Sequence, residues 1–149
     1  MLEILADNAY FYLEKYRYNN KIKDLIQKYN LQLKLLLSDG EIMLYENKYQ
    51  KILWYLHYLP NTKDLTLLVT INWFTSKKII NWLSKILLNR YITFLKEEKT
   101  KKVFIRSILP SAFYFWENIS NFYLKHWLIK SFEKIQTLDS WYKHFIWNL

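Results

Sequence analysis

Hydrophobic residues in this chain recur mostly at spacings of three and four, the period of an amphipathic helix. The clearest case covers residues 76–95, where Ser76 is a residue type that caps helices. The apolar positions of this segment are Ile79, Ile80, Leu83, Ile86, Leu87, Tyr91 and Phe94. The positions between them form a polar stripe of Lys78, Asn81, Lys85 and Asn89. The pattern predicts an amphipathic helix with one face turned toward a core.

The same period predicts helices over most of the remaining chain. The predicted ranges are 7–18, 20–36, 41–59, 65–74, 101–109 and 111–135, with a last helix over 138–147. Gly40, in the turn Ser38-Asp39-Gly40, is expected to end the second helix in the left-handed conformation, and Pro110 to break or kink a helix. Residues 65–74 contain Leu-Leu-Val-Thr-Ile, which has strand character, but a lone strand would have no partner. The prediction is an all-α single domain, 1–149, of about seven amphipathic helices in an irregular bundle.

The scarcity of glycine and cysteine excludes several classes of site. Gly40 is the one glycine, and Pro60 and Pro110 are the two prolines. A chain with one glycine holds no Rossmann fingerprint, Walker loop or G-x-S-x-G elbow. The absence of cysteine excludes disulfides, thiolate zinc sites, cysteine-ligated iron–sulfur clusters and cysteine nucleophiles.

The remaining polar residues suggest no catalytic or metal site. His57, His126 and His144 lack metal-ligand spacing, and the Glu97-Glu98 pair lies between lysines in an expected loop. No serine, histidine and aspartate show a local catalytic signature. The sequence therefore predicts a protein that is not an enzyme, with no cofactor, no metal and no small-molecule substrate.

Composition points to an AT-rich gene. Phe, Tyr, Met, Ile, Asn and Lys, whose codons are rich in A and T, make up 71 of the 149 residues. Seven tryptophans exceed what this bias gives with the standard code, and a code that reads UGA as Trp would permit them. We expect a mitochondrial protein, in the matrix or on the matrix face of the inner membrane. No segment is typical of a secretory signal or of a membrane span.

The net charge of +9 is unevenly distributed. Residues 1–64 hold 9 basic and 8 acidic side chains, whereas residues 65–149 hold 13 and 5. The near-neutral first half and basic second half suggest that the second half faces an anionic partner, either RNA or anionic lipid. A solvated surface in a lysine-rich protein is the simpler alternative. The candidate binding residues are Lys77, Lys78, Lys85, Arg90, Lys99, Lys101, Lys102 and Arg106.

The carboxyl-terminal segment is unusually apolar. Trp141, Phe145 and Trp147 lie in a run with apolar residues on both faces, although chain ends usually fray. The pattern predicts that these three residues dock on a partner subunit.

These patterns favour a non-catalytic structural subunit of a large organellar assembly. The first hypothesis is a mitochondrial ribosomal protein that contacts rRNA through its basic half. The alternative is an accessory subunit of a respiratory-chain complex or ATP synthase, packed on other subunits or at the membrane surface. A third is a free-standing helical protein of an AT-rich microbe or virus.

Overall fold

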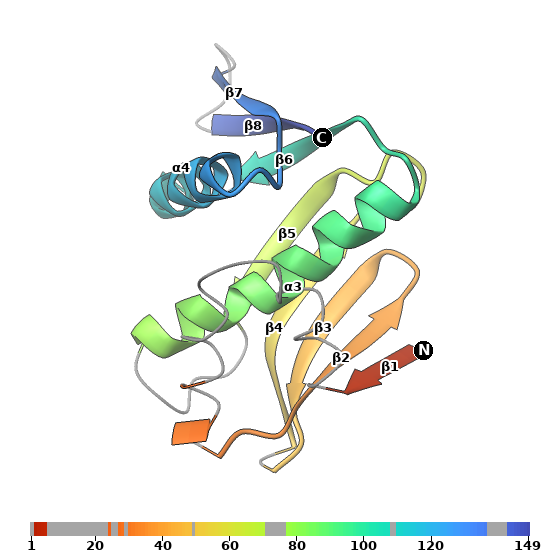
Figure 1. The fold of residues 1–149 in the computed structure, drawn as a ribbon, viewed down its shortest axis with the longest axis vertical. Helices are drawn as coiled ribbons and strands as arrows, with labels where there is room; N and C mark the ends of the chain where they lie inside the picture. The colour runs from red at the N-terminus through yellow and green to blue at the C-terminus, as the bar shows by residue number, and fades with distance from the viewer. Residues whose placement is uncertain are drawn as a thin grey trace. The chain divides into compact units, whose positions relative to one another are not determined.

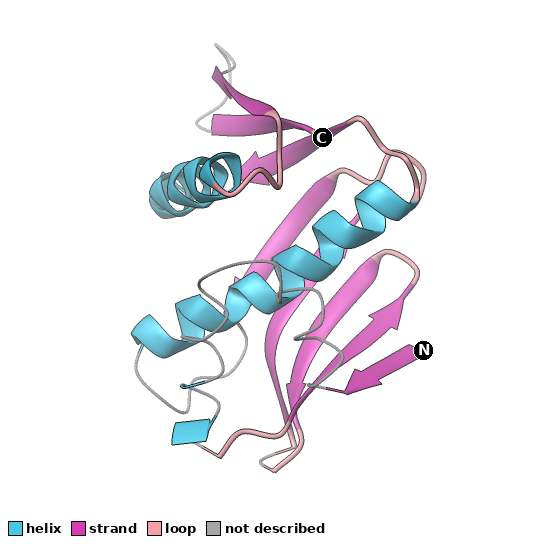
Figure 2. Ribbon diagram, in the orientation of Figure 1, coloured by secondary structure: helices cyan, strands magenta, loops and turns pink. Residues whose placement is uncertain are grey.

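The protein is a mixed α/β protein, so the prediction of an all-α bundle is wrong. The computed structural model describes residues 2–5, 24, 27–28, 30–48, 50–70, 77–107, 110–136 and 143–149. The elements, drawn in Figures 1 and 2, are β1 (Leu2–Leu5), β2 (Leu33–Ser38), β3 (Glu41–Glu46), β4 (Lys51–Tyr58), β5 (Leu65–Thr70), α3 (Lys77–Glu97), β6 (Lys102–Ser107), α4 (Pro110–Lys125), β7 (Ser131–Gln136) and β8 (Lys143–Asn148). The strands are hydrogen-bonded in the order β1-β2-β3-β4-β5-β6-β8-β7.

Six of the predicted helices overlap strands, one of them the range 111–135, whose last five residues belong to β7. The range 41–59 contains β3 and β4, 65–74 contains β5, and 101–109 contains β6. The end of 20–36 is the first part of β2, and the end of 138–147 lies in β8. The predicted helix 7–18 lies outside the described residues.

The strands β3 and β4 were missed because buried residues follow one another directly in them. Adjacent residues in a strand point to opposite faces of the sheet, yet Leu53 and Trp54 in β4 are both buried. In β3, Ile42, Met43 and Leu44 are buried in succession. A strand covered on both faces reads as a continuous apolar run, in which a helical spacing can also be found.

The two long helices were partly predicted. The predicted helix 76–95 is confirmed as α3, with Leu83, Leu87 and Tyr91 fully buried. Asn89, which the sequence placed on a polar stripe, is instead buried. Pro110 does not kink a helix but is the first residue of α4, where proline has no intrahelical hydrogen bond to lose.

Turns in this chain use left-handed residues other than glycine. Gly40, with φ of 80°, belongs to the two-residue loop that joins β2 to β3, so it turns a hairpin and does not end a helix. Five further residues have positive φ, namely Asn30, Gln50, Lys63, Lys99 and Trp127. A non-glycine residue in this region costs about 1–2 kcal/mol, which the surrounding fold offsets. One glycine is therefore enough for a chain with many tight turns.

The chain divides into two compact units. The first consists of Met1–Leu56 with Leu68–Thr93, and the second of His57–Leu67 with Phe94–Leu149. In the first, β1 and β3 flank β2 in antiparallel register, with Leu2 opposite Leu37 and Leu33 opposite Glu46. Its fully buried side chains include Leu35, Leu44, Leu53 and Leu56, together with Leu83, Leu87 and Tyr91 of α3.

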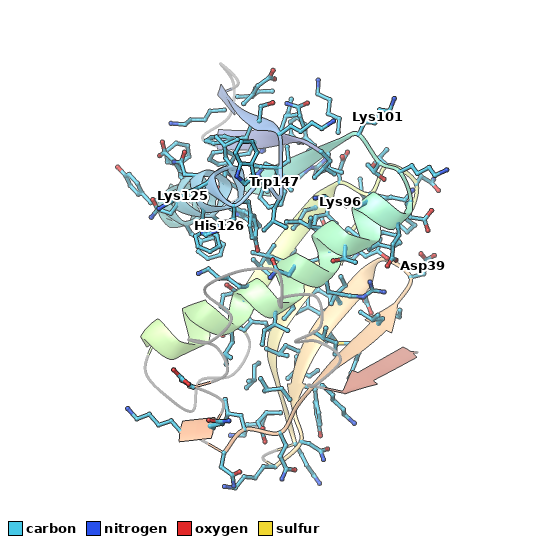
Figure 3. All side chains as sticks on the ribbon, in the orientation of Figure 1. Asp39, Lys96, Lys101, Lys125, His126 and Trp147 are labelled. Carbon is cyan, nitrogen blue, oxygen red and sulfur yellow. The ribbon has the colours of Figure 1, made fainter. Side chains whose placement is uncertain are left out.

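The second unit is built on β6, β8 and β7, in which the central strand β8 is antiparallel to both neighbours. Val103 stands opposite Trp147 in β8, and Phe132 in β7 stands opposite Trp147 on the other side. The helix α4 packs on these strands, with the rings of Trp116 and Tyr123 edge-on to Trp147 at 6.0 and 5.6 Å between centroids. Trp147, labelled in Figure 3, is the largest fully buried side chain described.

Candidate functional site

The parallel ladder between β5 and β6 stops early within the second unit. Leu65 pairs with Ile105, and no further rung joins the described residues of these strands, although both strands continue. The exposure of β5 changes at the same point. Leu65 is fully buried, whereas Leu67, two residues further along the same face, is 38% exposed. Beyond this pair, the facing edges of Leu67 and Arg106 carry no ladder hydrogen bond, and we call these two edges the opening of the ladder.

The backbone direction shows which groups line this opening. The N–H of Phe104 donates to the carboxylate of Asp64 at 2.9 Å, so the polar groups of Phe104 and Arg106 point toward β5. Because Leu65 pairs with Ile105, the backbone N–H and carbonyl of Leu65 point toward β6. The backbone groups of Leu67 point the same way, because their direction along a strand repeats every two residues. The backbone groups of Leu67 and the carbonyl of Arg106 thus point toward each other, but no ladder hydrogen bond joins them.

A buried hydroxyl lies at the end of β6. Ser107 is 2% exposed, and its Oγ has no hydrogen-bond partner among the described residues. It shares a face of β6 with Val103 and Ile105, which α4 covers. Leaving a buried hydroxyl unbonded costs about 1–3 kcal/mol.

His57, near the end of β4, is hydrogen-bonded to Thr66 on β5. The Thr66 Oγ1 lies 3.2 Å from the carbonyl of His57 and 2.5 Å from its Nδ1. When the hydroxyl donates to the carbonyl, Nδ1 carries the proton and donates to Oγ1, which leaves Nε2 with its lone pair. His57 is only partly buried, so in this tautomer Nε2 can accept a proton from a ligand.

Arg106 and His144 stand on the same face as Thr66. Leu65 and Ile105 share the opposite face, so the next residues, Thr66 and Arg106, lie together on this one. His144 is the register partner of Arg106 on β8. Burial lowers the pKa of His144 below 6.5, and the positive charge of Arg106 lowers it further. We name His57, Thr66, Arg106 and His144 the polar face of the second unit.

The predicted basic residues fall into both units. Lys77, Lys78, Lys85 and Arg90 belong to α3 in the first unit, and the side chains of Lys77 and Lys78 lie outside the described part of the structure. Lys99, Lys101, Lys102 and Arg106 belong to the second unit and are exposed. Figure 3 labels Lys101, just before β6. Because residues 102–107 form a strand, the basic surface that two neighbouring helices were expected to share is not built as predicted.

The predicted docking residues are placed differently. Phe145 and Trp147 are both fully buried in the core of the second unit, which leaves neither side chain a surface for a partner. Trp141 lies outside the described residues. The apolar carboxyl-terminal run is explained by β8, which lies between β6 and β7 and is covered by α4.

Sequence reasoning missed His57, Thr66 and Ser107. His57 and Thr66 are nine residues apart on two different strands, Ser107 lies on a third, and no motif joins them. The signal that could have found His57 is the polar turn 60–64 between the apolar runs 52–59 and 65–70, which would have suggested two adjacent strands.

Two further features concern membranes and metals. Neither helix within the described residues is long and apolar enough to cross a bilayer. No group of three or more histidine or acidic side chains in the described part of the chain could hold a metal ion.

Comparison with known proteins gives a likeness in fold alone. A GNAT-family acetyltransferase from Staphylococcus aureus Mu50 is 20% identical with a TM-score of 0.46, over 91% of this chain and 79% of that one. A protein from Desulfovibrio desulfuricans assigned to the same family is 10% identical with a TM-score of 0.44, over 99% of this chain and 97% of the other. These values assign no residue of this protein a role. No protein-family model and no curated protein sequence matches the chain.

The predicted function is corrected because the fold on which it rested is wrong. A ribosomal or respiratory structural subunit was inferred for an all-α bundle, whereas the chain folds as a mixed α/β protein. The predictions of rRNA as partner, of no enzyme activity and of no small-molecule substrate were made for that bundle and are not kept.

Proposed function

We propose that this protein is an acyltransferase that moves an acetyl group from a thioester donor to an amine. The observation that carries the proposal is the early end of the β5–β6 ladder, after the pair Leu65 and Ile105. An extended ligand with amide groups can add to an open strand edge through backbone hydrogen bonds. The pantetheine arm of coenzyme A is such a ligand, and Leu67 is the exposed residue beside which it would lie.

The chemistry needs a group that takes a proton from the acceptor. An amine is protonated at neutral pH and becomes a nucleophile only after losing that proton. His57 has the required lone pair on Nε2 in the tautomer that carries its proton on Nδ1, toward Thr66. The amine nitrogen then forms a bond to the acyl carbon, the carbon–sulfur bond breaks, and the thiolate takes up a proton as the free thiol. The net release is one proton per amide formed.

The transition state places negative charge on the acyl oxygen. Backbone N–H groups that are held in place stabilise such an oxyanion without reorganisation. The N–H of Leu67 points toward the opening and is not used in the β5–β6 ladder, so it is the donor that we assign to this oxygen.

The first experiment fills the opening with a bulky side chain. Release of free thiol from acetyl coenzyme A is followed with the purified chain and a mixture of small amines. Leu67→Trp is compared with Leu124→Trp, because both leucines are 38% exposed and only Leu67 lies at the ladder end. We expect Leu67→Trp to raise the KM for the donor about tenfold or more, and Leu124→Trp to leave it unchanged. No thiol release with any amine, or equal effects of the two variants, would contradict the proposal.

The second experiment removes the proposed base. His57→Gln should lower kcat by about 100-fold or more, in the range that general bases contribute. His126→Gln is the matched control, because His126 follows α4 and stacks on Phe122 at 4.4 Å between ring centroids. Donor binding, measured by calorimetry, should be the same in both variants. An unchanged kcat for His57→Gln would remove this residue from the reaction.

A further inference from the structure

Arg106 carries an accessible positive charge on the polar face of the second unit. Its side chain is exposed, and no acidic side chain in the described part of the chain lies within ion-pair distance of it. The residue opposite it on β8 is His144, whose lowered pKa keeps it neutral at neutral pH. Of this pair, the guanidinium of Arg106 is therefore the group that carries a positive charge at neutral pH.

The register places Arg106 level with His57. Thr66 and Arg106 each follow one residue after the paired residues Leu65 and Ile105. His57 bonds to Thr66 from the next strand. Paired strands are about 4.8 Å apart, and the β5–β6 ladder ends at Leu65, so His57 and Arg106 are separated by roughly 10 Å or more across the sheet, with the short side chain of Thr66 between them. A small molecule lying over Thr66 can reach both.

We infer that the acceptor of this enzyme is a small amine that also carries an anionic oxygen group, a carboxylate or a phosphate. The inference rests on the proposed acyl transfer and names its acceptor. A guanidinium matches two oxygens of such a group through parallel N–H donors. With the anion on Arg106, the amine of the same molecule lies over Thr66, toward Nε2 of His57. This contact favours anionic acceptors, because a neutral amine does not bind the guanidinium and is not held with its nitrogen toward Nε2 of His57.

The test compares matched acceptors with and without the anion, and rates are expressed per concentration of unprotonated amine because the anion also changes the pKa of the amine. Glycine is paired with glycinamide, and phosphoethanolamine with ethanolamine, each with acetyl coenzyme A and the full chain. We expect kcat/KM to be at least tenfold higher for one or both of the anionic acceptors than for its neutral partner. Glycine and phosphoethanolamine distinguish a carboxylate from a phosphate as the preferred group.

Arg106→Gln should abolish this preference by raising KM for the anionic acceptors at least tenfold. Lys102→Gln is the matched control, because Lys102 is an exposed cation on the same strand and face, about 13 Å away at 3.3 Å per residue. Equal use of anionic and neutral amines by the unmodified protein would overturn the inference. So would a loss in Lys102→Gln as large as in Arg106→Gln.

Calorimetry of phosphoethanolamine and glycine binding without donor separates the two proposals. Binding that disappears in Arg106→Gln, together with no acetyl transfer to any amine, would keep the anion site and refute the acyltransferase. Transfer to neutral amines without binding of either anionic ligand would keep the acyltransferase and refute the anion site.

Discussion

The hydrogen bond between Trp147 and Ser120 gives the sharpest test of the core of the second unit. Both side chains are fully buried, and the indole Nε1 donates to the Ser120 hydroxyl at 2.8 Å. Ser120→Ala leaves the indole N–H buried without an acceptor, which should lower the free energy of unfolding by about 1–3 kcal/mol. Trp147→Phe removes the donor and leaves space between Trp116 and Tyr123, and should cost about 3 kcal/mol.

Because the two residues share one interaction, their effects should not add. In the double variant both the donor and the acceptor are removed, so neither is left buried without its partner. The decrease in the free energy of unfolding should therefore be about 1 kcal/mol smaller than the sum of the two single decreases. Urea denaturation followed by far-ultraviolet circular dichroism measures all four proteins. Trp127→Phe is the control, because Trp127 is 90% exposed and its loss should change stability by less than about 0.5 kcal/mol.

The same series tests whether Trp147 docks on a partner, as the sequence suggested. A docking residue would be dispensable for folding of the isolated chain. Equal stability of Trp147→Phe and Trp127→Phe, or additive losses for Trp147→Phe and Ser120→Ala, would refute the assignment of Trp147 to the core.

Four further predictions concern buried groups and the gene. Burial and the hydrogen bond to Glu41 raise the pKa of Tyr55 to about 12. The stabilisation that the protonated Tyr55 contributes is therefore present below pH 10 and is lost as the pH rises from 10 to 12. In Tyr55→Phe the free energy of unfolding should fall less steeply with pH over this range. The pKa of His144 is lowered, so the stabilisation that neutral His144 contributes to the fold is present above pH 6.5 and falls as the pH drops below that value. The free energy of unfolding of His144→Gln should therefore decrease less in acid than that of the unmodified protein. Ser107→Ala removes an unbonded buried hydroxyl and should raise the free energy of unfolding by about 1 kcal/mol in urea, whereas a decrease would show an unseen partner. The mitochondrial location stays a prediction, and UGA codons at any of the seven tryptophans in the gene would support it, whereas UGG at all seven would remove that support.

Part of the candidate site was within reach of the sequence. Arg106 was selected as an anion-binding residue from the charge of residues 65–149, and the structure places it, exposed, on the polar face of the second unit. Its neighbours there could not be found, because each arrives from a different strand. Thr66 and Arg106 are 40 residues apart, and only the β5–β6 register puts them at one level.

By itself, the sequence determined the elements whose signals are local. The apolar spacing over 20 residues placed α3 to within two residues, and Asp39-Gly40 marked a turn where one occurs. Both depend on contacts between residues close in the chain. The sequence also excluded disulfides and glycine-rich phosphate loops, since these need residues that the chain lacks.

Only the tertiary structure decided between helix and strand in the apolar segments. With 52% hydrophobic residues, a helical spacing can be found in β4 as easily as in α3. What makes residues 102–107 a strand is pairing with β8 and the amide of Phe104 bound by Asp64, 40 residues earlier. Turns at Lys63, between two strands, and at Lys99, between α3 and β6, use left-handed residues that local preference disfavours, and the packing of the elements on either side offsets their cost. Such long-range terms outweigh local propensity and leave no periodic trace in the sequence.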